Sequence, residues 1–354
     1  MSAAHDKAYE KKLREAYMKM LMAMGKNRFP APFHGDTSHL PCSPADAARI
    51  ALTGELSSVL RPSHPENPTG FNLEAQLGRF VLSSKNSVPE FDPRGHPSAE
   101  SYEAWRKANH SRIGIPSNTY SIKGRGMVAC LSDLERRFLS YCEMNPMVLE
   151  IRSQYPEWDR KKSASALASD EKLLETDIMT IDFVLTLQSP HTNKVRYHAV
   201  SCKTYKELYL PKTIRRHARE VEFLRLWGCT HQIVTEFFFS KYQDVNNQRL
   251  LQFMLHTKNI YELIPAAYKF ASLIRRAKGS GSLDELIAWA AKQLGLALDA
   301  GYTLLGVAHY VGFMVCDHSK ELLPETQLDF NEENRRFLPR IDLNLISGAT
   351  NDDE

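Results

Sequence analysis

Two hydrophobic segments in the middle of the chain each carry a charged residue where an ordinary core strand has none. Met179–Leu187 and Arg196–Tyr205 have the length and apolar character of strands, and they contain Asp182 and Lys203, respectively. A charge inside an apolar strand is costly unless a partner compensates it. If the two strands are neighbours in a sheet, the carboxylate and the ammonium group can meet at one edge of it.

The segments around these strands predict a core that mixes strands and helices. By hydrophobic period we expect a helix, three strands, a second helix and a fourth strand, in the order αβββαβ. Their expected ranges are Ser132–Asn145, Val148–Tyr155, Met179–Leu187, Arg196–Tyr205, Ile214–Trp227 and Gln232–Phe239. Gly228 follows the second helix, where glycine commonly ends a helix. The fold class is therefore α/β, and residues 111–242 are expected to hold this core.

The residues before the core show a weaker pattern. Lys7–Met24 has the pattern of an amphipathic helix, and Ser43–Leu60 begins with a serine that suits a helix cap. Six prolines then interrupt the next stretch of the chain. We expect residues 1–110 to form an accessory N-terminal extension, to which the sequence assigns no chemistry.

Beyond residue 243 the chain is mostly helical. The expected helices are Asn246–Leu255, Ile260–Ala277, Ser282–Leu294 and Ala300–Val311, and strand candidates follow at Gly312–Cys316 and Leu322–Phe330. Ser282 and Glu285 form a capping box at the start of the third helix. Helices followed by a ribbon are the order of a winged helix, although a plain helical bundle with a terminal ribbon has the same pattern. This domain is expected to span residues 243–332, followed by a frayed tail at 333–354.

Composition is that of a globular intracellular protein. The chain has 354 residues, 43% of them hydrophobic and 25% charged, which is enough for two or three domains. There is no run of eighteen apolar residues and the amino terminus is rich in charge, so we expect neither a membrane span nor a signal peptide. The six cysteines form no C-x-x-C pair, which argues against a zinc site and a disulfide framework.

A second carboxylate completes a candidate metal site. Glu135 lies near the start of the helix expected before the sheet, and Ser201 shares a strand face with Lys203 because side chains two apart point the same way. Two carboxylates about 4 Å apart repel by roughly 4 kcal/mol at an effective dielectric of about 20, and a divalent cation removes that cost. Oxygen ligands favour Mg²⁺ or Mn²⁺. The candidate catalytic residues for phosphodiester hydrolysis are therefore Glu135, Asp182 and Lys203.

Each of these residues also has an ordinary structural interpretation. Glu135 lies three residues after Ser132 and so completes an S-x-x-E capping box. Asp182 and Lys203 can be a partly buried ion pair and nothing more. Glu220, on the following helix, either reaches the metal or forms an ion pair on the helix surface with neighbouring arginines.

Basic side chains follow the candidate site directly. After Lys203 they are Lys206, Lys212, Arg215, Arg216 and Arg219. A solvated helix face is the usual interpretation of such a run, but beside a phosphate-cleaving centre, contact with the DNA backbone is the better one. Lys123 and Arg125 form a second cluster, in Lys123-Gly-Arg-Gly126, that is either a phosphate contact or a plain turn.

An ordered series of short motifs gives the chain a family resemblance. They are Ser121-Ile-Lys-Gly-Arg-Gly-Met127, Leu131-Ser-Asp-Leu-Glu135-Arg-Arg-Phe138, Glu150-Ile-Arg-Ser-Gln-Tyr-Pro156, Met179-Thr-Ile-Asp-Phe183, Val200-Ser-Cys-Lys203, Arg219-Glu-Val-Glu222 and Ile233-Val-Thr-Glu236. Between about Ile115 and Glu236 the sequence resembles the TnsA endonuclease subunit of heteromeric transposases. The carboxy-terminal half resembles that family's winged-helix domain in element order only.

The resemblance implies a restriction-endonuclease-like core that uses Mg²⁺ to cut the non-transferred strand at the 5′ ends of a transposon. The family's catalytic positions fall on Glu135, Asp182 and Lys203. Ser201 stands where family members carry a longer amide or acid, which leaves the further metal ligand open among Ser201, a backbone carbonyl at Cys202, and Glu220. The implied partners are transposon-end DNA, a TnsB-like integrase-type transposase and a TnsC-like ATPase regulator, in a prokaryotic cytoplasm.

Two other functions fit the same residues. One is a stand-alone restriction or repair endonuclease with the same core, since a fold does not fix a biological role. The other is a catalytically silent DNA-binding scaffold that bridges transposase and regulator, against which the intact acid, acid and lysine set argues. A neighbouring gene for an integrase-type transposase would favour transposition, and one for a methyltransferase would favour restriction.

Overall fold

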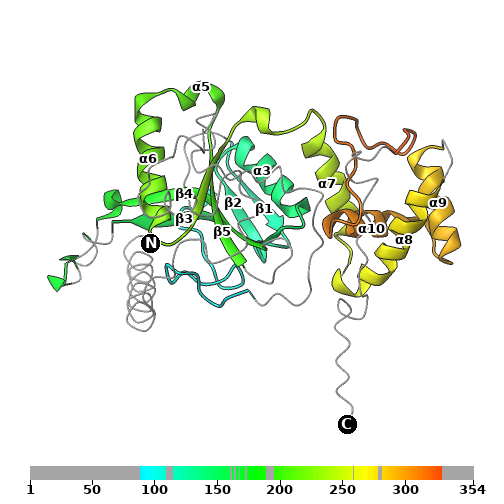
Figure 1. The fold of residues 1–354 in the computed structure, drawn as a ribbon, viewed down its shortest axis with the longest axis horizontal. Coiled ribbons are helices and arrows are strands. Elements are labelled where there is room, and N and C mark those ends of the chain that lie inside the picture. The colour runs from blue at the N-terminus through cyan, green and yellow to red at the C-terminus, as the bar shows by residue number, and fades with distance from the viewer. Residues whose placement is uncertain are drawn as a thin grey trace, which may run out of the picture. The chain divides into compact units, whose positions relative to one another are not determined.

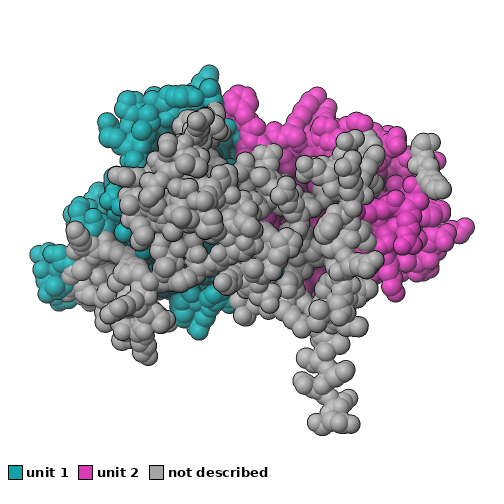
Figure 2. All heavy atoms as spheres, viewed as in Figure 1, with its two compact units in different colours: residues 1–72, 87–136, 149–235 teal, residues 73–86, 137–148, 236–354 magenta. Residues whose placement is uncertain are grey.

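The computed structural model describes residues 88–108, 115–159, 162, 165–166, 168–171, 174–188, 195–257, 259–277 and 281–328. The chain divides into two compact units (Figure 2). Unit 1 comprises Met1–Asn72, Ser87–Arg136 and Leu149–Thr235, and unit 2 comprises Leu73–Asn86, Arg137–Val148 and Glu236–Glu354. The helices expected at Lys7–Met24 and Ser43–Leu60, and the tail at 333–354, lie outside the described residues.

Unit 1 contains a four-stranded sheet with the order β3-β4-β5-β6. The strands are β3 Val148–Trp158, β4 Ile178–Gln188, β5 Val195–Cys202 and β6 Thr230–Val234 (Figure 1). β4 and β5 are antiparallel, with Phe183 opposite Val200, whereas β5 and β6 are parallel. A parallel pair needs a crossover connection, and helix α6, Pro211–Arg225, lies in it. The expected mixed α/β class and the expected strands are confirmed.

Three details of this core differ from the expectation. β5 ends at Cys202, so Lys203 follows the strand and does not lie within it. β6 ends at Val234, which pairs with Cys202, the last residue of β5, so β5 offers no further residue for pairing. A 3-10 helix, Glu236–Phe238, follows in place of the rest of the expected strand. A short helix, α5 Tyr205–Leu208, precedes α6 and begins with a capping box.

An antiparallel hairpin that the sequence analysis did not predict precedes helix α3. Its strands are β1 Ser117–Ser121 and β2 Gly126–Cys130, and the Lys123-Gly-Arg-Gly126 segment is its turn. Arg125 has φ 56° and Gly126 has φ 148°, so the turn depends on backbone conformations that glycine adopts most readily. Helix α3, Asp133–Met144, starts shortly after β2, and its first turn belongs to unit 1.

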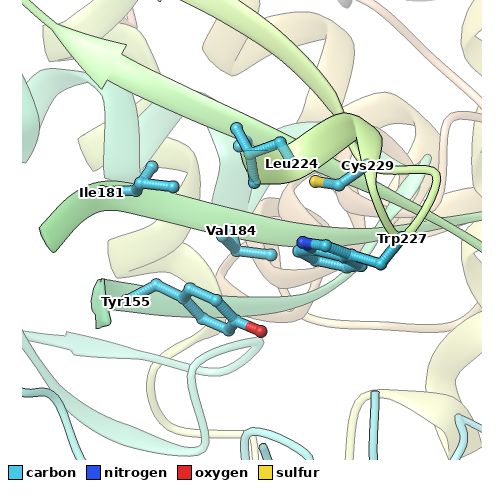
Figure 3. Packing of buried hydrophobic residues seen from close by; sticks show 7 residues of the cluster. Tyr155, Ile181, Val184, Leu224, Trp227 and Cys229 are labelled. Atoms are coloured by element: carbon cyan, nitrogen blue, oxygen red, sulfur yellow. The ribbon is translucent and has the colours of Figure 1, made fainter. Parts of the chain in front are cut away.

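Residues from three strands and from the end of α6 form a hydrophobic cluster in unit 1 (Figure 3). Its buried members are Tyr155, Ile181, Val184, Ala199, Leu224, Trp227 and Cys229. The indole nitrogen of Trp227 donates a hydrogen bond to Glu157 Oε1 at 2.9 Å, which satisfies the polar group that the ring buries. This packing fixes α6, and with it the basic residues of that helix, against the sheet.

Residues 88–108, expected within the N-terminal extension, pack on β3 in unit 1. Asp92 forms an ion pair with Arg152, and Arg94 lies 2.7 Å from Glu157 in a second pair. All four side chains are almost fully buried. Removing one partner of such a pair leaves an uncompensated charge at a cost of about 3–5 kcal/mol, so these contacts tie the segment to the core.

Besides residues 137–144 of α3, the described part of unit 2 contains four helices of eleven to thirteen residues: α7 Gln243–Met254, α8 Ile264–Arg276, α9 Leu283–Gln293 and α10 Leu298–Tyr310. Helix α10 packs against the other three. A Cβ atom at Gly306 would lie 2.7 Å from the Leu250 carbonyl, and one at Gly301 would lie 2.6 Å from Ile287, so both glycines allow close helix packing. The expected capping box of Ser282 and Glu285 is present. Across the described ranges, no helix is long and apolar enough to cross a bilayer.

The two strands expected after α10 are absent from the described residues. The described parts of Gly312–Cys316 and Leu322–Phe330 form no strand, and an isolated bridge joins Gln327 to Ser282. Side chains of α7 satisfy this backbone instead: Asn246 Nδ2 donates to Lys320 O at 2.8 Å, and the Leu322 N–H donates to Asn246 Oδ1 at 2.8 Å. The prediction of a terminal hairpin was therefore wrong for these residues, because helix side chains replaced the partner strand.

Candidate metal and active site

Glu135 lies in the first turn of α3 with its carboxylate buried and fully engaged. The Ser132 hydroxyl donates to Oε1 at 3.0 Å, and the Leu131 N–H donates to Oε2 at 2.9 Å. In the other direction, the Glu135 N–H donates to Ser132 Oγ at 3.2 Å, which is the capping contact expected from the sequence. The cap is therefore real, but it does not account for the burial of a charged side chain.

Asp182 and Lys203 meet where β4 passes the end of β5. Asp182 Oδ2 accepts a hydrogen bond from the Cys202 N–H at 2.7 Å and lies 3.4 Å from Lys203 Nζ. The same ammonium group donates to the Cys202 carbonyl at 2.8 Å. Lys203 keeps about a fifth of its side chain exposed. The pair that the strand pattern predicted is present, and the backbone of Cys202 joins it.

Electrostatics connects Glu135 to this pair. Burial, together with the negative charge of Asp182, raises the pKa of Glu135 from 4.5 to about 7, against the hydrogen bonds from Leu131 and Ser132. The charge of Asp182 is also the main cause of the raised pKa of Lys203. The charges of Glu135, Asp182 and Lys203 are thus coupled, and the repulsion between the two carboxylates is what a divalent cation would relieve.

Ser201 and Glu220 turn toward each other in a neighbouring buried network. Ser201 Oγ donates to Glu220 Oε2 at 2.8 Å, and Arg216 Nε donates to Glu220 Oε1 at 2.8 Å. His231 Nε2 lies 3.1 Å from Glu220 Oε2. Burial acts to raise the pKa of Glu220, but the hydrogen bond and charge of His231 and the charge of Arg216 hold it below the usual value. Glu220 is therefore a buried carboxylate paired with Arg216 and His231, not an ion pair on the helix surface.

The oxygen donors present here suit magnesium, which does not need a closed cage of protein ligands. In the described part of the chain, no three His, Cys, Asp or Glu side chains are arranged to hold a metal ion. Magnesium usually keeps several waters and takes only one or two carboxylates from the protein. Asp182, Glu135 and the Cys202 carbonyl are hard oxygen donors of that kind, so the residues present fit the expected cation, whereas Ser201 and Glu220 belong to the adjoining network.

One site residue escaped the sequence analysis. Gln154 of β3 is buried, and its Nε2 donates to Glu135 Oε2 at 3.0 Å. Its φ is 48°, a conformation that costs a non-glycine residue energy and that clusters at functional sites. The sequence offered no clear signal, because Gln154 is one of several polar residues in this strand, with Glu150, Arg152 and Ser153. This backbone conformation directs the Gln154 side-chain amide toward the Glu135 carboxylate.

The basic residues divide into exposed and engaged side chains. Exposed ones are Lys206, Lys212, Arg215 and Arg219 on α5 and α6, and Arg125 at the hairpin turn. Arg216 is partly exposed but donates to Glu220 and to the Thr180 carbonyl. Lys123 is only 3% exposed, which favours a plain turn over a phosphate contact by its side chain. The turn lies against β3, where the Ile151 N–H donates to the Lys123 carbonyl at 3.2 Å, and spacing in the sequence does not reveal this contact.

Comparison with known proteins gives no family assignment, since neither a protein-family model nor a curated protein matches the sequence. The feature with the most chemical content is the Asp182–Lys203 pair, to which buried Glu135 is electrostatically coupled, beside exposed basic side chains.

Proposed function

We propose that this protein is a Mg²⁺-dependent DNA endonuclease with a restriction-endonuclease-like core. It acts as the TnsA-type subunit of a heteromeric transposase and hydrolyses the non-transferred strand at the 5′ ends of a transposon. The observation that carries the proposal is the grouping of two buried carboxylates with a lysine that is held charged. A solvated helix face does not require buried carboxylates beside a lysine, whereas a catalytic site does. The basic residues on α6 supply a surface for a phosphate backbone.

Residues around the site have separate parts in this reaction. Asp182, Glu135 and the Cys202 carbonyl would hold Mg²⁺, which would polarise the scissile phosphate and lower the pKa of a bound water. The Lys203 ammonium group, held charged by Asp182, stabilises negative charge that develops on the phosphate during attack. Gln154 and Ser132 hold the Glu135 carboxylate in one orientation through their hydrogen bonds.

The partner transposase fits the proposal because the described residues contain no strong element for sequence readout. The first turns of α10 contain Ala300, Gly301, Tyr302 and Thr303, which are poor in the Arg, Asn and Gln side chains that read base edges. The exposed basic residues of α6 contact backbone, which carries no sequence information directly. Specificity for transposon ends would then come from the integrase-type transposase, with an ATPase regulator controlling the assembly.

The decisive substitution is Asp182→Asn, which removes a charge and little volume. Cleavage of transposon-end DNA would be measured with Mg²⁺ and the partner transposase present, and Mn²⁺ binding to the chain alone would be measured by calorimetry. We expect both to be lost while the chain still folds cooperatively. Asp177→Asn is the control, because this carboxylate is partly exposed, pairs with Lys162 and precedes β4. Wild-type cleavage by Asp182→Asn would refute the proposal, and specific double-strand cutting without a partner would replace transposition by restriction.

A further inference from the structure

Two exposed tyrosines follow the candidate catalytic lysine, Tyr205 at the start of α5 and Tyr209 at its C-cap. Tyr205 is 38% exposed and Tyr209 is 54% exposed. They are one helical turn apart. Their rings meet edge to face, with centroids 5.5 Å apart and planes at 77°, and the Tyr209 hydroxyl donates to the Tyr205 hydroxyl at 3.1 Å. The pair is thus an ordered aromatic surface that remains open to solvent.

The surroundings of this pair are positively charged. Lys206 lies between the two tyrosines in sequence, and Lys212 follows in the first turn of α6, where there is no acidic residue; both lysines are exposed. Figure 1 shows that α5 leads directly into α6. The one acidic residue of α5, Glu207, is used by the helix cap, where its carboxylate accepts hydrogen bonds from the N–H and the hydroxyl of Thr204.

Exposed aromatic rings interleaved with lysines fit one class of ligand well. Unpaired bases stack on aromatic side chains regardless of sequence, and lysines beside the rings neutralise the phosphates between those bases. Duplex DNA offers no free base faces, because each base is already stacked. A protein partner would use the apolar area, but it would have to be acidic, and it would not need ring faces in particular.

We propose that Tyr205 and Tyr209, with Lys206 and Lys212, bind single-stranded DNA beside the cleavage site. The identity of that strand rests on the proposed nuclease function: it is the substrate strand next to the scissile phosphate, with bases that are unpaired while it is cut. Lys203 lies two residues before Tyr205, so a strand held at Lys203 reaches the rings within the length of a few nucleotides. The surface then selects frayed or melted DNA ends over intact duplex.

The test compares binding of a fluorescent oligothymidine with binding of a hairpin duplex, by anisotropy and without divalent cation, so that no cleavage occurs. Replacing both tyrosines by alanine should weaken binding of the single strand by roughly tenfold or more and leave duplex binding within about twofold. Replacing both by phenylalanine should preserve single-strand binding, because stacking needs the rings and not the hydroxyls. Tyr261→Ala, at an exposed tyrosine of unit 2, is the matched control and should bind both DNAs like the wild type.

The two lysines give the complementary result. Lys206→Ala combined with Lys212→Ala should weaken binding of both DNAs and flatten the salt dependence, whereas the alanine pair at the tyrosines should leave the salt slope unchanged. Single-strand affinity equal to wild type in a folded alanine pair would overturn the proposal. Unchanged DNA binding combined with a lost interaction with the transposase would also overturn it, in favour of a protein-docking surface.

These outcomes are separable from failure of the proposed function. Asp182→Asn leaves the tyrosine surface intact, so replacing both tyrosines in that background should still weaken single-strand binding by roughly tenfold. If the wild-type chain binds the single strand through its tyrosines but never cleaves DNA, the nuclease assignment fails while the binding surface stands. If it cleaves and the tyrosine variants bind normally, only the binding surface fails.

Discussion

Glu135→Gln removes a buried charge with little change in shape: its amide oxygen can still accept from Leu131 and Gln154, and its amide nitrogen can donate to Ser132 Oγ. Burial and the charge of Asp182 raise the pKa of Glu135 from 4.5 to about 7. A carboxyl whose pKa is higher in the folded than in the unfolded chain holds its proton more tightly when folded. Its contribution to stability is therefore present below pH 4.5 and is lost as pH rises through about 7. Above that window the ionised side chain destabilises the fold by roughly 3 kcal/mol.

Without divalent cation at pH 8, the Glu135→Gln variant should therefore be more stable than the wild type by up to about 3 kcal/mol, or roughly 5–10 °C in melting temperature. At pH 4 the difference should vanish, because the wild-type side chain is then neutral as well. The measurement is thermal unfolding by circular dichroism at both pH values with EDTA. Asp133→Asn is the control, because that carboxylate is exposed and pairs only with Arg136, and its effect should stay within about 1 kcal/mol at either pH.

The same variant separates catalysis from capping. Glutamine serves in a capping box as glutamate does, so a residue that only caps would leave activity intact. We expect Glu135→Gln to lose DNA cleavage in the presence of the partner while melting at a higher temperature than the wild type. A variant that melts no higher at pH 8 refutes the argument from the buried charge. A fully active one returns Glu135 to a structural role.

Two further predictions concern the lysine and the partner. Lys203→Ala should slow single-turnover cleavage by roughly a hundredfold or more and change DNA affinity by only about threefold. The double variant Arg215→Ala with Arg219→Ala should instead weaken DNA binding and lower the salt dependence of that binding. A Lys203→Ala variant that loses DNA affinity but keeps its cleavage rate would make Lys203 a phosphate contact. The isolated chain should cut transposon-end DNA poorly and gain activity when the transposase is added, because its own surface reads backbone only; equal rates with and without the partner in a gel assay would contradict this.

Local patterns in the sequence were sufficient for much of the architecture. The strands β3, β4 and β5 and the helices α3 and α6 follow from apolar periodicity, which depends on neighbouring residues only. The capping boxes at Ser132 and Ser282 follow from a spacing of three residues. Asp182 and Lys203 could be paired in advance because consecutive strands usually lie side by side, and β4 and β5 do so.

What the sequence left open depends on contacts between distant segments. Whether Glu220 is free to bind a metal is decided by His231 and Arg216, which the fold brings to its two oxygens. Lys123 has the pattern of a surface cation in the sequence, but its side chain is buried in the folded structure. Gln154 became part of the site only through a left-handed backbone that aims it at Glu135. The amphipathic period of an element shows which of its faces is buried. The partner of a buried polar group is fixed only when segments distant in sequence pack together, as for Glu135 and Gln154, which are nineteen residues apart.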